Sequence, residues 1–161
     1  MLLHPLCKGH AFPVLGSMFT DSGVAAGGAI LDKYPIMPYL PNAHTRVKVY
    51  PVAVYTDRVS TWKYKVLVLR NPKTGKKVYV HVVDECSDST SSCRKNKRLA
   101  RQSGRILVDI HKSAWRALGL KTPGLYNLKA GYVNTISRKN GAMKPVLSNE
   151  GKKGYVAKGW R

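Results

Sequence analysis

Two apolar runs that each end at a carboxylate constrain the fold of this chain more than any other feature. The first run is Val78–Asp84, V-Y-V-H-V-V-D, and the second is Ile106–Asp109, I-L-V-D. Short runs rich in β-branched residues are typical of buried strands. After Asp109 the apolar spacing changes to that of a short helix, which Gly119 ends. The sequence therefore predicts a strand, a connection, a second strand and a helical turn.

A carboxylate at the end of a buried strand has two alternative roles. It caps a helix or a turn, or it is placed in a groove for chemistry. The residues alone leave both roles open for Asp84 and for Asp109.

Further strand patterns extend this unit to a whole domain. Alternating valines mark Arg46–Tyr55, where Pro51 favours an edge strand or a bend. Lys63–Arg70 leads through N-P-K-T-G-K-K into the first apolar run, which predicts a hairpin. Tyr126–Ser137 supplies a last strand. About six short strands with one or two short helices predict a mainly β fold, a small closed barrel, because closure removes exposed edges.

The length of 161 residues suits one domain. We predict an N-terminal extension over residues 1–15, a barrel domain over 16–138 and a basic C-terminal tail over 139–161. The tail has too few apolar residues to form a core of its own. We expect it either to pack back onto the barrel or to dock on a neighbouring subunit, with Tyr155 or Trp160 as the anchor.

The charge of the chain is unusual, because 28 Lys and Arg oppose 8 Asp and Glu, a net charge of +20. Such a charge predicts a polyanionic partner, which is a nucleic acid, an acidic membrane, an acidic cell-wall polymer or an acidic protein surface. Positive charge is dense in the segment 87–105, which we interpret as a long loop. Its candidate polyanion-binding residues are Arg94, Lys95, Lys97, Arg98, Arg101 and Arg105.

The three cysteines are too few for a disulfide scaffold and lack the paired spacings of a zinc site. We expect neither a metal nor a cofactor. Cys86 and Cys93 are spaced so that a disulfide between them is sterically easy, and the sequence leaves open whether it forms.

The N-terminal segment does not read as a signal peptide, because His4, Pro5 and Lys8 interrupt its apolar residues. No stretch has the roughly 20 apolar residues of a transmembrane segment. We therefore expect secretion by another route, or carriage in a particle such as a virion.

Three segments resemble the expansin-type barrel domain. They are F-T-D-S-G-V-A-A-G-G-A-I-L-D at Phe19–Asp32, K-K-V-Y-V-H-V-V-D at Lys76–Asp84, and L-V-D-I-H-K-S-A-W-R-A-L at Leu107–Leu118. Their order and spacing also resemble the family, over roughly Gly16–Ile136. The resemblance implies a six-stranded double-psi β-barrel, the fold of expansins, bacterial rare lipoprotein A proteins, barwin-like proteins and family-45 endoglucanases.

The resemblance also implies a set of groove residues. Thr20 matches the groove threonine, Asp84 the first groove aspartate, and Asp109 the aspartate that protonates the leaving glycosidic oxygen in hydrolytic relatives. We expect these three side chains to share one groove and Asp109 to have a raised pKa. His111 replaces a serine of the expansin motif, and we interpret it as a surface histidine or a contact at the groove rim. Trp115 falls at a core-facing position, so we interpret it as packing.

Three classes of function follow. The favoured one is an expansin-like module that binds or loosens cell-wall polysaccharide without hydrolysis, as expansins do although they lack the second catalytic base of the endoglucanases. The second is a structural component of a large assembly such as a viral capsid, in which the charge binds a polyanion and both tails contact neighbouring subunits. The third is a lytic glycoside hydrolase, which requires two carboxylates in one groove.

Overall fold

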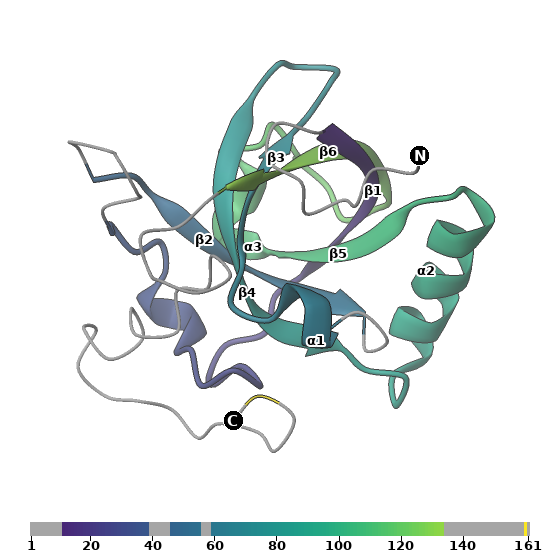
Figure 1. Cartoon of the computed structure of the whole chain (residues 1–161), viewed down its shortest axis with the longest axis horizontal. Coiled ribbons are helices and arrows are strands. Elements are labelled where there is room, and N and C mark those ends of the chain that lie inside the picture. Colours follow the sequence, from purple (N-terminus) through teal and green to yellow (C-terminus); the bar gives the residue numbers. More distant parts are fainter. Residues whose placement is uncertain (1–10, 39–45, 56–58, 134–159, 161) are drawn as a thin grey trace.

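The computed structural model describes residues 11–38, 46–55, 59–133 and 160. Six strands in this part of the chain close into a barrel in the order β1-β5-β2-β4-β3-β6 (Figure 1). The strands are β1 (Ala11–Phe19), β2 (Val49–Tyr55), β3 (Val66–Arg70), β4 (Lys77–Cys86), β5 (Ile106–His111) and β6 (Tyr126–Val133). The predicted mainly β fold with a six-stranded barrel is confirmed.

Parallel and antiparallel pairs share the barrel. β1 pairs in parallel with β5, and β2 pairs in parallel with β4. The remaining neighbours, which include β3 and β4, are antiparallel. The predicted β3–β4 hairpin is confirmed, since the amide of Asn71 donates to the carbonyl of Lys76 at 2.9 Å and Gly75 takes a φ of 72° in the turn.

Alternate residues of the strands fill the barrel. Val52 and Val54 of β2 and Val108 and Ile110 of β5 belong to this main core and are 1% exposed or less. Two smaller apolar clusters combine strand residues with residues of the connections, one around Leu31 and the other beneath α2. The other residues of β2 are also covered, so this strand is buried along its whole length. It is therefore not the edge strand that Pro51 suggested.

Three strands extend beyond the predicted boundaries, whereas β2 and β3 begin three residues later than predicted. β1 begins at Ala11, which pairs with Gly131, so the barrel includes residues assigned above to the N-terminal extension. β4 continues past Asp84 to Cys86, and β5 continues past Asp109 to His111. Both carboxylates therefore lie within paired strands rather than at the strand ends.

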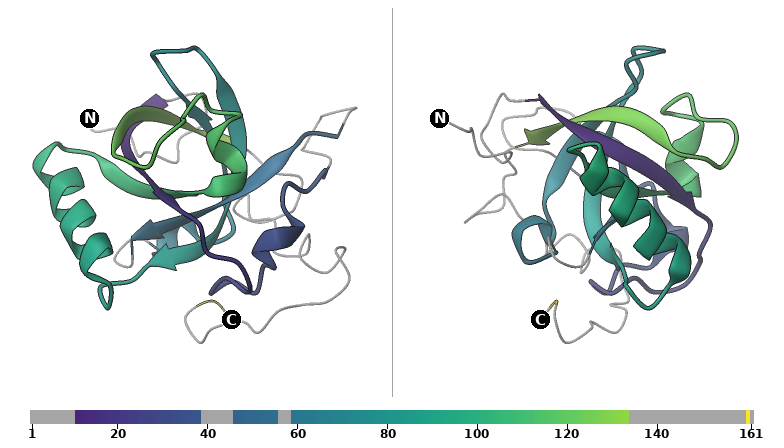
Figure 2. Two further views of the ribbon diagram at one scale, coloured as in Figure 1. Left: turned by 180° about the vertical axis from the view of Figure 1, so that it is seen from behind. Right: turned by 90° about the vertical axis from the view of Figure 1, so that its right-hand side faces the viewer.

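The described helices are short except for one. η1 (Leu31–Lys33), α1 (Val59–Trp62) and α3 (Lys112–Trp115) are single turns, whereas α2 spans Ser91–Gln102. The interpretation of the basic segment as a loop was therefore wrong. The apolar face of α2 is narrow, but Lys97 is buried. Three further residues of the helix contribute to the apolar cluster beneath it, namely Cys93, Leu99 and Ala100. Figure 2 shows α2 against the outside of the barrel.

Trp160 packs onto the barrel of its own chain. Its side chain is 0% exposed, its ring lies 5.2 Å from the ring of Tyr64, and its carbonyl accepts a hydrogen bond from the Tyr64 hydroxyl. Of the two alternatives for this anchor, packing back onto the barrel is the one observed. Tyr155 and the rest of the predicted tail lie outside the described residues.

Candidate functional site

Four residues with small or polar side chains lie side by side, one on each of four neighbouring strands. Asp109 on β5 is the register partner of Ser17 on β1 and of Ala53 on β2. Ala53 is in turn the partner of Asp84 on β4. We call Ser17, Asp109, Ala53 and Asp84 the carboxylate row.

The row faces away from the barrel interior. Register partners on adjacent strands project to the same face, and the residues on either side of Asp109, Val108 and Ile110, fill the core. The register of β2 and β4 shifts between Val52 and Ala53, which brings Asp84 into the row. With neighbouring strands about 4.8 Å apart, the two aspartate backbones lie roughly 10 Å from each other.

Asp109 is a carboxyl group that titrates close to neutral pH. Burial raises its pKa to about 6, although a hydrogen bond donated by the Ser17 hydroxyl at 2.7 Å works in the opposite direction. The negative charges of Asp21 and Asp84 raise the pKa further. The predicted raised pKa of Asp109 is confirmed, and the group can donate a proton at mildly acidic pH.

Asp84 has the role of a turn cap. Its Oδ1 atom accepts hydrogen bonds from the backbone amides of Ala26 at 3.1 Å and of Glu85 at 2.9 Å. Burial raises its pKa, and these two bonds oppose that rise. The carboxylate thereby attaches the glycine-rich loop after β1 to β4.

The predicted groove threonine is not part of the row. Thr20 is exposed, and among the described residues no hydrogen bond joins it to Asp84 or Asp109. Ser17 supplies the hydroxyl instead. The alternation of β1 could have identified it, because Leu15, Ser17 and Phe19 share the outward face.

His111 is a buried positioning residue, so its interpretation as a surface histidine was wrong. Its side chain is 1% exposed. Nε2 lies 2.8 Å from the carbonyl oxygen of Asp21, and Nδ1 lies 2.8 Å from Oγ of Ser113. His111 thus caps α3 and fixes Asp21, whose charge acts on both aspartates of the row.

Four of the six predicted polyanion-binding residues come together on α2. Arg94, Lys97, Arg98 and Arg101 line a cavity of about 650 Å³ together with Asp88 and Gln102. We call these four the α2 cation cluster. Asp88 organises it, because the Lys97 ammonium group pairs with its carboxylate and Nη1 of Arg94 donates to its carbonyl at 2.6 Å.

The other two predicted cations lie apart from this cavity. Lys95 is exposed but does not line it. Arg105 is half-buried, and its Nη1 donates to the carbonyl of Val14 at 3.4 Å. The six cations are close in sequence, but the fold places Lys95 and Arg105 away from the four residues of the α2 cation cluster.

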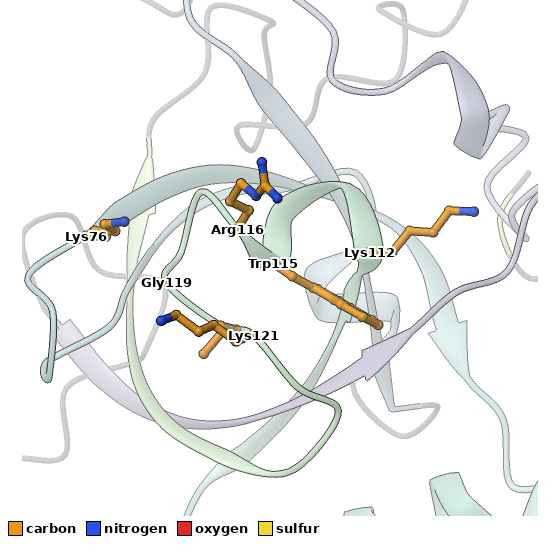
Figure 3. Close-up of a pocket in the computed structure, with 7 residues that line it drawn as sticks. Lys76, Lys112, Trp115, Arg116, Gly119 and Lys121 are labelled. Atoms are coloured by element: carbon orange, nitrogen blue, oxygen red, sulfur yellow. The ribbon is translucent and has the colours of Figure 1, made fainter.

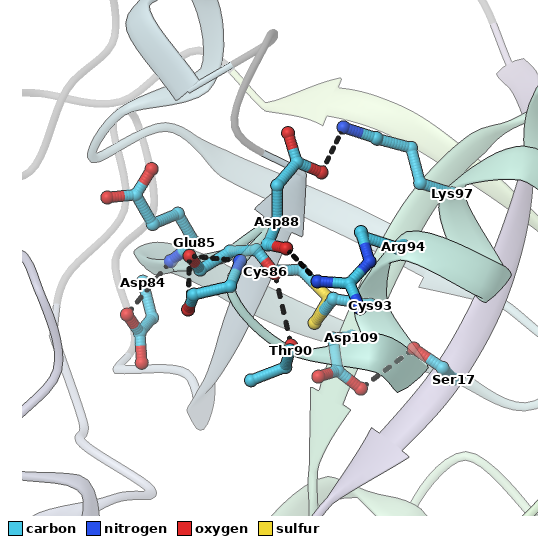
Figure 4. Close-up of a disulfide and its surroundings, with 12 residues drawn as sticks. Ser17, Asp84, Glu85, Cys86, Asp88, Thr90, Cys93, Arg94, Lys97 and Asp109 are labelled. Carbon is cyan, nitrogen blue, oxygen red and sulfur yellow. Dashed lines mark hydrogen bonds and ion pairs between the residues drawn. A yellow bond between two sulfur atoms is a disulfide. The ribbon is translucent and has the colours of Figure 1, made fainter.

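A disulfide joins β4 to α2 beside the carboxylate row. Cys86 at the end of β4 is bonded to Cys93 in the first turn of the helix. The two sulfur atoms and a carboxylate oxygen of Asp109 all lie within 4.8 Å of one another (Figure 4). Because disulfide sulfurs lack the thiolate charge that binds metals, this group is not a metal centre in its bonded form.

In the described part of the chain, no helix combines the length and the apolar character that spanning a membrane demands. The sequence matches no family model and no curated protein.

The structure is similar to two solved structures of the expansin of Clavibacter michiganensis. The first is a mutant in complex with cellohexaose, with 17% identity, a TM-score of 0.46, and coverage of 81% of this chain and 54% of that chain. The second is the apo protein, with 18% identity, a TM-score of 0.45, and coverage of 80% and 53%. This chain therefore spans about half the length of those expansin chains. Both solved structures belong to the family that the sequence motifs resemble.

Proposed function

We propose that this chain is an expansin-like module that binds polysaccharide along the carboxylate row and loosens contacts between polymer chains without cleaving them. The observation that carries the proposal is the state of Asp109. Its carboxyl group is held near a pKa of 6 and is oriented by the Ser17 hydroxyl, on the segment whose sequence resembles the expansin motif.

Loosening a polymer requires groups that compete for the hydrogen bonds between its chains. A carboxyl group that is ionised at one moment and protonated at the next accepts from sugar hydroxyls and donates to them. Asp109 is the group of the row that can do both, and Ala53 separates it from Asp84.

The surroundings of Asp84 favour binding over hydrolysis. Cleavage by the common mechanism needs a protonated carboxyl group and a second, ionised carboxylate that activates water or attacks the sugar. The Oδ1 atom of Asp84 is engaged by two backbone amides, which suits a fixed turn cap better than a catalytic base. Asp84 is therefore poorly suited to be the ionised partner of Asp109 in hydrolysis.

The α2 cation cluster supports an additional electrostatic contact with an anionic polymer. It lies beside the carboxylate row, to which the Cys86–Cys93 disulfide connects it (Figure 4). A role in a capsid or similar assembly stays a prediction. The packing of Trp160 on its own barrel does not support it, because that residue was a proposed anchor for a neighbouring subunit.

The proposal is tested by binding of cellohexaose and of insoluble cellulose to the wild type and to Asp109→Asn. The substitution keeps the shape of the side chain and its acceptor for Ser17, but removes the titrating proton. We expect a loss of affinity of about tenfold, the usual effect of one charged hydrogen bond. Asp32→Asn is the matched control, since Asp32 is exposed and lies outside the row.

Unchanged affinity of Asp109→Asn would contradict the proposal. A reducing-end assay on the same samples tests the hydrolytic alternative. Release of reducing ends by the wild type, abolished in Asp109→Asn, would assign the row to a glycoside hydrolase instead.

A further inference from the structure

A second pocket lies between the β3–β4 hairpin and the segment that follows β5. It has a volume of about 440 Å³ (Figure 3). The pocket is lined by Lys76, Lys112, Trp115, Arg116, Gly119, Leu120 and Lys121. We call it the Trp115 pocket. It involves none of the carboxylate row and none of the α2 cation cluster.

The walls of this pocket are fixed by hydrogen bonds. The indole Nε1 of Trp115 donates to the carbonyl of Ile110 at 2.9 Å, and the carbonyl of Trp115 accepts from the amide of Leu120 at 2.8 Å. Nδ2 of Asn71, on the hairpin, donates to the carbonyl of Leu118 at 3.0 Å. The pocket is therefore preorganised, which lowers the entropic cost of binding a ligand.

Close packing at Gly119 fixes the turn in the same way. Gly119 has a φ of 80°, and a Cβ atom there would lie 3.1 Å from the side chain of Thr74. The turn therefore rests directly on the hairpin, and a larger residue would separate the two walls.

The charge of the pocket indicates an anionic ligand. Its four cations, Lys76, Lys112, Arg116 and Lys121, are all exposed, and no lining residue is acidic. Among the described residues, no salt bridge neutralises any of them. Four positive charges around one cavity repel one another, and an anion between them relieves that repulsion.

Trp115 adds a flat apolar surface to this positive field. Its indole N–H group is bonded to the backbone of its own segment, and its partly buried ring packs against the main core and lines the pocket (Figure 3). An aromatic face with a few converging polar groups is the usual lining of a site for a small ring-shaped ligand.

We propose that the Trp115 pocket binds one acidic sugar unit of a polysaccharide, with the ring on Trp115 and its carboxylate or sulfate between the cations. This inference rests on the proposed function and adds acidic sugar units to the polysaccharides that the chain recognises. A single nucleic-acid strand is the competing ligand, but such strands are bound by successive aromatic side chains. The exposed large apolar residues of the described chain are not aromatic, namely Val24, Met37 and Leu125.

The test is titration with an oligogalacturonate, followed by tryptophan fluorescence. Trp62 and Trp160 are 1% exposed or less, so a ligand-dependent change reports on Trp115, and Trp115→Phe should abolish it. We expect Arg116→Gln with Lys121→Gln to weaken binding by about tenfold or more, since two charged contacts are lost. The matched control is Lys73→Gln with Lys77→Gln, which removes the same charge from exposed positions outside the pocket. It should change the affinity less than about twofold, as surface charges usually do.

Two further ligands, together with the control variant, decide between the possibilities. A sulfated oligosaccharide that replaces the oligogalacturonate supports the proposal and identifies sulfate as the anionic group. Equal weakening in both double variants would overturn it, because binding would then follow net charge alone. Preference for a single-stranded oligonucleotide over both acidic sugars would also overturn it.

Asp109→Asn separates this inference from the proposed function. If Asp109→Asn loses cellohexaose binding while the pocket variants keep oligogalacturonate binding, the row is a sugar site and the pocket inference fails. If the pocket variants lose oligogalacturonate binding while Asp109→Asn binds cellohexaose normally, the pocket stands and the proposed role of the row fails.

Discussion

The hydroxyl group of Ser17 donates a 2.7 Å hydrogen bond to the carboxylate of Asp109 across the parallel pair of β1 and β5. The bond stabilises the ionised form and opposes the effect of burial, yet the pKa of this carboxyl group is still raised to about 6. Because the pKa of Asp109 is higher in the folded than in the unfolded protein, the stability of the protein depends on pH, and this dependence can be measured.

Asp109→Asn should stabilise the protein at neutral and alkaline pH. The raised pKa means that ionised Asp109 costs folding free energy above pH 6, whereas the cost disappears below the unfolded value near 3.8. We therefore expect the variant to be more stable by about 1–3 kcal/mol near pH 8 and equal to the wild type near pH 3.5. Urea unfolding at both pH values measures this difference.

The prediction concerns the difference in stability between Asp109→Asn and the wild type at each pH. The stability of either protein alone also contains the contribution of His81, which has the opposite pH dependence. Burial lowers the pKa of His81 to about 3, so its contribution is lost as the pH falls below 6.5, in both proteins alike. Ser17→Ala provides a second test by carboxyl NMR, since losing its bond should raise the pKa of Asp109 further. Equal stability of Asp109→Asn and wild type near pH 8 would show that Asp109 is not held in this state.

Trp160→Ala should strongly destabilise the isolated chain. Trp160 is fully buried in the main core, and truncation of such a residue usually costs about 3–5 kcal/mol. Thermal unfolding measures the loss, and Trp160→Phe, which retains most of the packing, should lose clearly less. An unchanged melting temperature for Trp160→Ala would contradict this packing and would favour the alternative that the tail contacts another subunit.

Reducing the Cys86–Cys93 disulfide should loosen α2 first. The bond closes a short loop, for which the stabilisation is about 2–3 kcal/mol, and it attaches a helix with few apolar contacts of its own. Hydrogen exchange of Cys86→Ser with Cys93→Ser should show lost protection in α2 while β3 and β6 stay protected. Uniform loss of protection through the barrel would contradict this local role.

The barrel could be predicted because local pattern and topology agree in it. The apolar runs that end near Asp84 and Asp109 became β4 and β5. The helical turn α3 ends at Trp115, before the predicted Gly119, which takes a positive φ in the turn that follows. Glycine at position 27 likewise allows a close approach, since a Cβ atom there would lie 2.7 Å from the carbonyl of Val83.

Other features depend on contacts that are distant in sequence. Ser17 meets Asp109 only through the β1–β5 register, so neither residue identifies the other locally. Helix α2 was hidden because its charge is typical of a loop, while its few apolar residues pack on Leu107 and Tyr55. His111 is buried because Asp21 and Ser113 satisfy both its nitrogens, which a single sequence does not reveal.

The α2 cation cluster should give binding to acidic polymers a strong salt dependence. Arg94→Gln with Arg98→Gln removes two of its charges, so the fall of affinity with salt should become less steep by roughly two released ions. Binding of an acidic polysaccharide across a salt series measures the slope. Lys73→Gln with Lys77→Gln again controls for net charge, and an equal change of slope in both variants would argue against a specific contact.

The carboxylate row is proposed to loosen a polysaccharide network without cutting it. Extension of a cellulose-containing sheet under constant load tests this most directly, with reducing ends counted in the same sample. We predict faster extension with the wild type, little or none with Asp109→Asn, and no release of reducing ends by either. Extension that is equal for the two proteins, or that proceeds in step with released reducing ends, would contradict the claim.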